Sequence, residues 1–350
     1  MNLLPEHEAS TVGEAAIDAA TFAEVLPTAA DVEDAAARIT DWLIATPVLE
    51  CDALSRRAGC RMLVKAESLQ HSGSFKIRGA LNRLLRLSRD EREAGVVAYS
   101  SGNHAQGVAM AARWLGMPAT IVMPKDAPKI KQLNTRTLGA EIVLYDRYRE
   151  DRERIAADLA AQRGAALVPA FDHPDIVAGQ GTVGLELAVF ARQSRLPLEA
   201  VLVPCGGGGL ISGTSLAIKA VFPECRMVAV EPEAYDDTAR SLALGSRQMV
   251  AGHPQTICDA LMSPTPGAIT FAINRTLLHK VITVSDAQAE HAMAFAARYL
   301  KLVLEPSGAV ALAAVLAGAA ADLDCAAIVL SGANVDRERY VSALDAYPDP

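Results

Sequence analysis

The 350-residue sequence has no cluster of lysine and arginine residues, and its formal net charge is −8 at pH 7. Binding to nucleic acid or to an anionic membrane surface depends largely on basic side chains that neutralise phosphates. We therefore expect no nucleic acid and no membrane among its partners. Aromatic residues amount to only 5%, whereas 51% of the chain is hydrophobic and 21% is charged. This balance is typical of a compact globular protein rather than a disordered one.

Signals for export and membrane insertion are also missing. The first residues contain no basic segment followed by an apolar one, as a secretion signal requires. The longest apolar run, residues 309–321, is shorter than the stretch of about 20 residues that crosses a bilayer. The cysteines form no Cys-x-x-Cys pair, so we expect reduced thiols and a cytoplasmic protein. The six cysteines are Cys51, Cys60, Cys205, Cys225, Cys258 and Cys325.

Apolar runs rich in β-branched residues alternate with amphipathic stretches along most of the chain. This alternation predicts an α/β fold with mainly parallel, twisted sheets flanked by helices. The runs are continuously apolar, as expected for parallel strands that are buried on both faces. The expected strands are residues 62–65, 96–99, 120–123, 142–145, 201–204, 227–230, 281–284 and 327–330. The expected helices include residues 104–115, 151–162, 181–192 and 287–300.

In such sheets ligands bind beyond the carboxyl ends of the strands, so motifs that follow expected strands are candidates for function. The first motif is Ser74-Phe75-Lys76, at the start of a helix expected to begin near Ser74. The helix dipole disfavours a cation in the first turn and so lowers the pKa of the Lys76 amine, as a Schiff-base lysine needs. The alternative is an ordinary solvated lysine.

The second motif is Ser100-Ser101-Gly102-Asn103-His104, between an expected strand and an expected helix. Backbone N–H groups and small hydroxyls at a helix N-terminus form an anion pocket, which suits a substrate carboxylate. Asn103 can donate a hydrogen bond to a phenolate oxygen. The alternative is a plain serine or asparagine helix cap.

The third motif is Gly206-Gly207-Gly208-Gly209-Leu210, again between a strand and a helix. Four successive glycines let bare backbone amides surround a phosphate dianion. The run does not fit GxGxxG, and no Walker Lys-Ser/Thr follows it. A small phosphate monoester is therefore favoured over a nucleotide.

The fourth motif, Ser331-Gly332-Ala333-Asn334, follows the last expected strand. Ser331 would present a neutral hydroxyl to a ring nitrogen, although Ser-Gly after a strand is also an ordinary turn. Together the four motifs supply an amine nucleophile, a carboxylate pocket, a phosphate cup and a polar end group. One cofactor, pyridoxal 5′-phosphate, matches this set.

The four motifs, in this order, resemble the fold-type II pyridoxal-phosphate enzymes of the tryptophan synthase β-like fold, in particular the threonine/serine dehydratase and serine racemase branch. The resemblance extends over about residues 26–344. It implies Lys76 as the Schiff-base lysine and Ser101 as a second acid/base residue, as in racemases. It implies cofactor contacts from Phe75, Lys76, Asn103, Gly206, Gly207, Gly208, Gly209, Leu210, Glu305 and Ser331. It implies substrate contacts from Ser100, Ser101, Gly102, Asn103 and His104.

The resemblance also implies a domain organisation. Residues 1–25 are expected to be a loose arm, residues 26–89 plus 173–350 a large cofactor-binding domain, and residues 90–172 a small mobile domain that closes over the substrate. A homodimer is the expected assembly. The acidic segment after residue 230 resembles the branch's divalent-cation loop, in which Glu231, Asp237 and the Tyr235 carbonyl would bind Mg²⁺ or Ca²⁺. A solvated acidic loop is the alternative.

The implied reaction is β-elimination from a small 3-hydroxy amino acid, such as L-threonine or L-serine, giving a 2-keto acid and ammonia. A neutral Ser331 opposite the ring nitrogen favours elimination over transamination. The branch leaves serine racemisation and 3-hydroxyaspartate dehydration open as alternatives. A sulfhydrylase-type synthase, which adds a nucleophile, and a non-catalytic phosphate-binding module are further alternatives.

Overall fold

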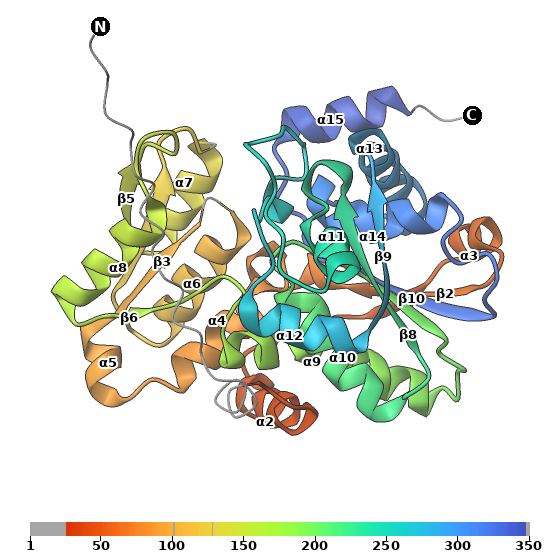
Figure 1. Ribbon diagram of the computed structural model, residues 1–350, viewed down its shortest axis with the longest axis horizontal. Coiled ribbons are helices and arrows are strands. Elements are labelled where there is room, and N and C mark those ends of the chain that lie inside the picture. The colour runs from red at the N-terminus through yellow and green to blue at the C-terminus, as the bar shows by residue number, and fades with distance from the viewer. Residues whose placement is uncertain (1–25, 101, 128, 348–350) are drawn as a thin grey trace, which may run out of the picture.

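The structure, a computed structural model, describes residues 26–100, 102–127 and 129–347. The expected N-terminal arm, residues 1–25, therefore lies outside the described residues. The described chain contains two separate sheets, each flanked by helices, which lie side by side (Figure 1). Both sheets are mainly parallel and every expected strand is present, so the predicted α/β fold is confirmed.

The larger sheet has the strand order β1-β2-β10-β7-β8-β9. All neighbours pair in parallel except β1, which runs antiparallel to β2 at the edge. With only three residues, β1 is too short for its apolar pattern to be recognised in the sequence. The six strands are β1 (Val48–Glu50), β2 (Arg61–Ala66), β10 (Cys325–Leu330), β7 (Ala200–Pro204), β8 (Arg226–Pro232) and β9 (Leu278–Val284).

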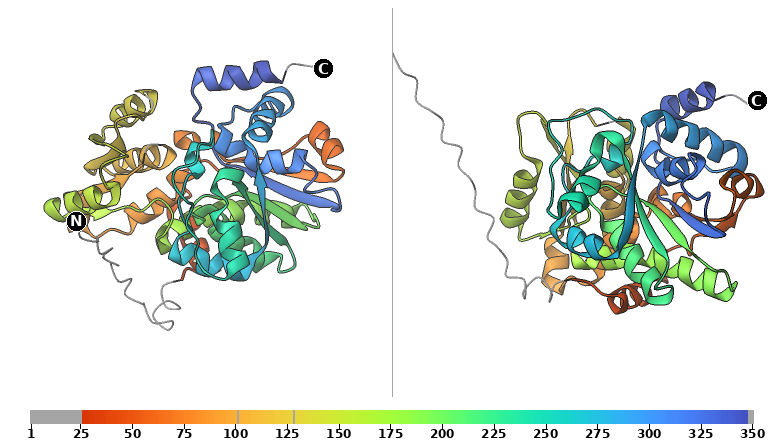
Figure 2. Two further views of the ribbon diagram at one scale, coloured as in Figure 1. Left: turned by 45° about the horizontal axis from the view of Figure 1, so that its top comes forward. Right: turned by 45° about the vertical axis from the view of Figure 1, so that its right-hand side comes forward.

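The smaller sheet has four parallel strands in the order β5-β4-β3-β6. All four come from the middle of the chain, between two segments that build the larger sheet. In the further views the helices of residues 103–163 remain at one end of the molecule (Figure 2). The strands are β5 (Glu141–Tyr145), β4 (Ala119–Pro124), β3 (Val96–Tyr99) and β6 (Ala166–Leu167).

Four helices test the sequence prediction directly. Helices α6 (Asn103–Trp114) and α8 (Arg152–Arg163) lie within one residue of their expected bounds. Helix α9 (Pro174–Gln193) begins seven residues earlier than the expected start at 181, with a proline in its first turn and His173 as its cap. The expected helix 287–300 is divided into α13 (Asp286–Phe295) and a π-helical turn, η5 (Ala296–Leu300).

The remaining helices connect these elements or cover the sheets. They are α2 (Ala29–Ile39), α3 (Asp52–Ala58), α4 (Lys76–Leu85), α5 (Arg89–Ala94), α7 (Lys129–Thr137), α10 (Gly209–Val221), α11 (Asp237–Leu244), α12 (Ala268–Leu277), α14 (Pro306–Leu316) and α15 (Arg337–Ala346). Short 3₁₀ turns are η1 (Glu67–Leu69), η2 (His71–Gly73), η3 (Glu233–Tyr235) and η4 (Asp259–Leu261). No helix in the described ranges is long and apolar enough to cross a bilayer.

Strand β2 shows how the larger sheet is buried on both faces. Met62 and Val64 belong to a core that includes α14, whereas Leu63 between them packs into a second core with α9 and α10. Successive side chains of a strand point to opposite faces, so both of its faces must be apolar. This arrangement explains the continuous apolar run in the sequence. Figure 1 shows α14 on one side of the sheet and α9 and α10 on the other.

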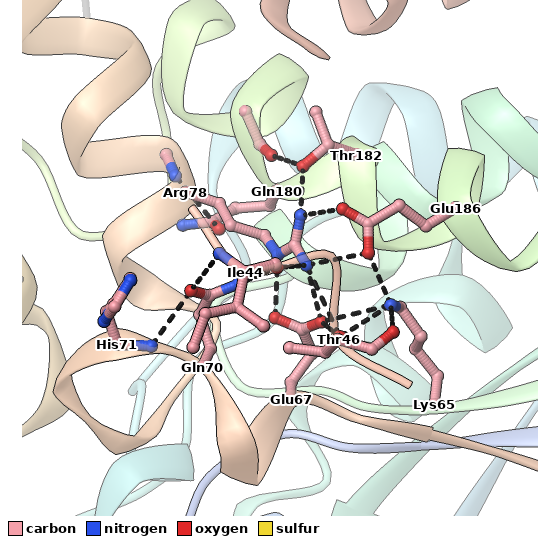
Figure 3. Close-up of polar contacts among 12 residues, drawn as sticks. Ile44, Thr46, Lys65, Glu67, Gln70, His71, Arg78, Gln180, Thr182 and Glu186 are labelled. Atoms are coloured by element: carbon pink, nitrogen blue, oxygen red, sulfur yellow. Dashed lines mark hydrogen bonds and ion pairs between the residues drawn. The ribbon is translucent and has the colours of Figure 1, made fainter. Parts of the chain in front are cut away.

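A group of four charges, of which three are buried and Glu186 is partly exposed, joins α4 to the larger sheet and to α9 (Figure 3). We call Lys65, Glu67, Arg78 and Glu186 the charge cluster. The Arg78 guanidinium lies 2.7 Å from Glu67 and 2.6 Å from Glu186, and Lys65 Nζ lies 2.5 Å from Glu186. Two positive and two negative charges balance, which offsets the cost of removing them from water. The cluster fixes the first turn of α4, where Lys76 lies.

Candidate active site

A cavity of about 200 Å³ opens where parallel strands of both sheets end. Its walls include the segments that follow β2, β3, β7 and β10, as expected for a ligand site in an α/β fold. The predicted cofactor and substrate residues that the structure describes all line it. They are Phe75, Lys76, Ser100, Gly102, Asn103, His104, Gly206, Gly207, Gly208, Gly209, Leu210, Glu305 and Ser331. Ser101, the remaining one, lies outside the described residues.

Lys76 is the first residue of α4, so the predicted helix start near Ser74 was two residues early. Its Nζ donates a hydrogen bond to the Ala170 carbonyl over 2.9 Å and lies 5.2 Å from the centre of the Phe75 ring. Burial lowers the pKa of Lys76 to about 8, although the Glu305 carboxyl raises it in part. The direction agrees with the sequence prediction, but the main cause is burial rather than the helix dipole.

The segment after β10 packs directly against the turn that precedes Lys76. Phe75 N–H donates to the Ser331 carbonyl over 3.2 Å, and Ala333 N–H donates to the Gly73 carbonyl over 2.9 Å. The Asn334 amide donates to Ser72 and to Asn103, each over 2.8 Å. The first and fourth motifs, more than 250 residues apart in the sequence, thus form one wall of the cavity.

Asn103 and Glu305 form a buried pair beside this wall. The Asn103 amide donates to Glu305 Oε1, whereas Glu305 Oε2 is buried and has no hydrogen-bond partner among the described residues. Burial and the nearby Asp259 charge raise the pKa of Glu305 to about 8, against smaller opposing effects of Lys131, Asn103 and Lys76. Glu305 is therefore mainly protonated and neutral at pH 7, and its unpartnered Oε2 can act as a hydrogen-bond donor.

The second motif places His104 in the first turn of α6. His104 Nε2 lies 2.9 Å from the Val168 carbonyl, which accepts a hydrogen bond from it, so Nδ1 carries the lone pair. Burial and the Lys76 charge lower the pKa of His104 to about 3, so the ring stays neutral. The first N–H groups of α6 have no acceptor within the helix and can bind an anion.

The glycines of the third motif permit contacts that no other residue could make. A Cβ on Gly207 would lie 2.4 Å from the Phe171 ring, and one on Gly208 would lie 2.9 Å from the Thr270 side chain. Gly208 also has φ +94°, a left-handed conformation that favours glycine. Helix α10 starts at Gly209 without a side-chain cap, which leaves its first N–H groups free for a ligand.

Several cavity residues gave no functional signal in the sequence. Phe171 and Ala170 follow β6, a strand of two residues that is too short to be recognised. Arg152, at the start of α8, lies with its guanidinium 5.6 Å from the Tyr99 ring centre and also lines the cavity. The segment 259–265, which begins with η4, closes another side. Recognition of β6 would have marked Phe171 as a residue at a strand end.

The predicted metal residues lie apart from the cavity, around η3 and the start of α11. The buried Glu231 carboxylate accepts hydrogen bonds from Thr238 and Ala239 N–H, each over 3.0 Å. Both oxygens of buried Asp237 lack a partner among the described residues. Tyr235 is buried in the turn between them. Within the part of the chain that the structure describes, no group of three or more His, Cys, Asp or Glu side chains could hold a metal ion.

Comparison with known proteins agrees with this geometry. A protein-family profile described as "Pyridoxal-phosphate dependent enzyme" matches residues 39–332. A relative from Pseudomonas sp, named L-threo-3-hydroxyaspartate ammonia-lyase, is 46% identical over 320 residues, which cover 90% of this chain and 97% of the relative. A serine racemase from Schizosaccharomyces pombe is 40% identical, and the match covers 91% of this chain and 98% of the racemase.

Solved structures show the same fold. The crystal structure of a threonine deaminase from T.th. superposes with a TM-score of 0.84 at 42% identity, over 89% of this chain and 99% of that one. Maize serine racemase superposes with a TM-score of 0.85 at 36% identity, over 92% of this chain and 98% of that one. The chain therefore belongs to the family of pyridoxal-phosphate dependent enzymes.

Proposed function

We propose that the protein removes the β-hydroxyl group of a small 3-hydroxy amino acid, such as L-threonine or L-serine, and releases a 2-keto acid and ammonia. One observation carries the proposal: Lys76, whose amine has a lowered pKa, lines the same cavity as four consecutive glycines. The names of two relatives described above, an L-threo-3-hydroxyaspartate ammonia-lyase and a threonine deaminase, agree with an elimination reaction.

The residues of the cavity fit pyridoxal phosphate. Lys76 would bind its aldehyde carbon, and the N–H groups of residues 206–210 would bind its phosphate, because the bare glycine backbone leaves them accessible. Asn103 Nδ2 and the unpartnered Glu305 Oε2 provide polar groups for the ring oxygen. Ser331 would lie near the ring nitrogen as a neutral partner. When bound, this cofactor withdraws electrons from the Cα–H bond of the amino acid.

The side chains around the substrate would have two tasks, to accept its Cα proton and to bind its carboxylate. With a pKa of about 8, Lys76 is a neutral amine in about a tenth of molecules at pH 7 and can accept the Cα proton of the substrate. The free N–H groups at the start of α6 would hold the substrate carboxylate with Ser100, Ser101, Gly102 and His104. Neutral His104 adds no charge there, so the helix N-terminus supplies the attraction.

The test of this proposal replaces Lys76 by alanine. The purified wild-type protein is expected to be yellow with pyridoxal phosphate, and Lys76→Ala should lose both the visible band and keto-acid release. The variant should keep its far-ultraviolet circular dichroism, because the side chain makes a single hydrogen bond, to Ala170. A retained band with unchanged turnover would contradict the assignment. Adding sulfide to the assay separates elimination from a sulfhydrylase-type replacement.

Arg152 supports a second candidate substrate, 3-hydroxyaspartate. Arg152 lines the cavity, and the planar fork of donors of a guanidinium suits a second carboxylate. A relative at 46% identity is named for the ammonia-lyase reaction on L-threo-3-hydroxyaspartate. Arg152→Met should raise KM for 3-hydroxyaspartate about tenfold or more and leave KM for serine within about twofold. Equal effects on both substrates would exclude this role for Arg152.

Racemisation is the other alternative, and it rests on the resemblance alone, which implies Ser101 as a second acid/base residue. We propose it as a side activity. Chiral analysis of serine recovered from the reaction measures it directly. Ser101→Ala should abolish the exchange of enantiomers while elimination of L-serine continues. Loss of both activities together would assign Ser101 to substrate binding instead.

We also propose a divalent cation, Mg²⁺ or Ca²⁺, at Glu231, Asp237 and the Tyr235 carbonyl. The two unpartnered oxygens of buried Asp237 support it, because buried carboxylates need a counter-charge. Millimolar Mg²⁺ should raise the melting temperature of the wild type but not of Asp237→Asn. If both proteins respond alike, the cation binds elsewhere.

The division into domains is a further part of the proposal. Residues 26–89 plus 173–350 would form the large domain, and residues 90–172 a small mobile one that contains the four-stranded sheet. The six cysteines are free thiols and five are buried, which supports a cytoplasmic, reducing compartment. The homodimer is proposed from the resemblance alone, and its test is the molar mass in solution.

A further inference from the structure

Three consecutive residues connect otherwise separate parts of the site. The Ala170 carbonyl accepts the Lys76 Nζ hydrogen bond, the Phe171 ring packs against Gly207, and the Phe171 backbone and Cβ lie against Gly209. Asp172, the third, does not line the cavity. Its carboxylate instead lies at the start of α12.

Asp172 caps α12 more completely than a usual cap residue. One carboxylate oxygen accepts a hydrogen bond from Ala268 N–H over 2.8 Å, and the other accepts from Ile269 and Thr270 N–H over 2.9 and 3.3 Å. The negative charge also complements the positive end of the helix dipole. These bonds fix the first turn of α12, although Asp172 is almost a hundred residues away in the sequence.

That first turn carries Thr270 to the back of the glycine loop. The buried Thr270 hydroxyl donates to the Gly207 carbonyl over 2.7 Å, and Gly267 N–H donates to the same oxygen over 3.3 Å. In a trans peptide the carbonyl and the following N–H point in opposite directions. The carbonyl of Gly207 faces α12, so the N–H of Gly208 faces away from α12. Among the described residues, α12 contributes none to the cavity wall.

The geometry points to Asp172 as a positioning residue for the phosphate-binding loop, acting through the first turn of α12 and the Thr270 hydroxyl. Without the cap, the Thr270 hydroxyl is no longer held against the Gly207 carbonyl, and that peptide can rotate. Rotation turns the Gly208 N–H away from the phosphate. This role rests on the proposed function only in requiring that residues 206–210 bind the phosphate of the cofactor.

The test compares two ligands, pyridoxal phosphate and pyridoxal, which lacks the phosphate but can still reach Lys76. For Asp172→Ala and for Thr270→Val we expect the dissociation constant of pyridoxal phosphate to rise about tenfold or more. The dissociation constant of pyridoxal should change by less than about twofold, because it makes no use of the loop. Thr270→Ser, which keeps the hydroxyl, should bind both ligands like the wild type.

Matched controls separate this role from simple loss of stability. Ser88→Ala removes an ordinary helix cap, on α5, whose residues do not line the cavity, and should leave both dissociation constants unchanged. Circular dichroism and urea unfolding confirm that each variant is folded. Both substitutions act through the bond between the Thr270 hydroxyl and the Gly207 carbonyl. The double variant Asp172→Ala, Thr270→Val should therefore have about the same dissociation constant for pyridoxal phosphate as the weaker-binding single variant.

Two results would overturn the inference. One is equal weakening of pyridoxal and pyridoxal phosphate binding, which would mean general damage to the site. The other is unchanged affinity for pyridoxal phosphate in Asp172→Ala. If the wild-type protein binds no pyridoxal phosphate, the proposed function is wrong, and that result is distinct from the two above because it appears without any substitution. Since turnover is not measured, failure of the proposed elimination reaction leaves this test intact.

Discussion

Replacing Glu305 by glutamine should remove a large pH dependence of stability. The pKa of this carboxyl rises from an ordinary 4.5 to about 8 in the folded protein, mainly through burial and then through Asp259. Between these two pKa values the unfolded chain releases the proton while the folded chain keeps it. Folding stability therefore falls as pH rises, by about 1.4 kcal/mol for each pH unit.

The size of the effect follows from that window. From pH 4.5 to pH 7 the wild-type protein should lose about 3 kcal/mol of stability through this one group. Glutamine has nearly the shape of the neutral acid: its carbonyl can accept from Asn103, and its amide can occupy the place of the protonated Oε2. The variant cannot ionise at this position, so its stability curve should lack the slope.

Urea unfolding of the cofactor-free proteins, between about pH 5 and about pH 9.5, measures the difference. The gap between Glu305→Gln and wild type should widen steadily with pH and become constant above about pH 8. Glu93→Gln, which removes an exposed carboxylate paired with Arg89, is the matched control and should run parallel to wild type. Parallel curves for Glu305→Gln would refute a proton held on Glu305 at neutral pH.

Three further changes test other parts of the structure. Gly207→Ala places a Cβ 2.4 Å from the Phe171 ring, so the loop or the ring must shift. Equilibrium dialysis should then show markedly weaker binding of pyridoxal phosphate. Unchanged binding would mean that the Phe171 ring moves aside without displacing the loop. Arg78→Met leaves buried Glu67 without its guanidinium partner and leaves Glu186 with Lys65 alone, so it should cost about 3–5 kcal/mol in urea unfolding. A loss under about 1 kcal/mol would show that the cluster relaxes. Lys131→Met removes a positive charge that lowers the pKa of Glu305, so the fall of stability with rising pH should continue to a higher pH than in the wild type. If stability stops falling at the same pH in both proteins, Lys131 does not influence the pKa of Glu305.

The sequence predicted most of the scaffold because the information was local. Buried parallel strands leave continuous apolar runs, and the residues after four of them, from Lys76 to Ser331, proved to share one cavity. Strands β1 and β6 escaped recognition because two or three residues give no period to detect. The early start of α9 escaped as well, since its first residues are Pro174 and Asp175 rather than an apolar repeat.

Features that depend on distant contacts could not be predicted. The sequence places Lys76 in a first helical turn, yet its lowered pKa comes mainly from burial, which only the tertiary structure creates. The raised pKa of Glu305 likewise depends on Asp259 and on packing. Phe171 and Thr270 reach the glycine loop from segments that carry no motif. Ordinary residues of this kind acquire a role only through their position.

The charge cluster restricts how this chain can be recombined with its relatives. Its four side chains come from three separate segments, around residues 65–67, at Arg78 and at Glu186 in α9 (Figure 3). A chimera joined anywhere between Arg78 and Glu186 takes its two cations from one parent and one of its two anions from the other. Unless both parents share the set, the hybrid buries an unmatched charge directly behind the helix that carries Lys76. Crossover points outside residues 65–186 avoid this mismatch.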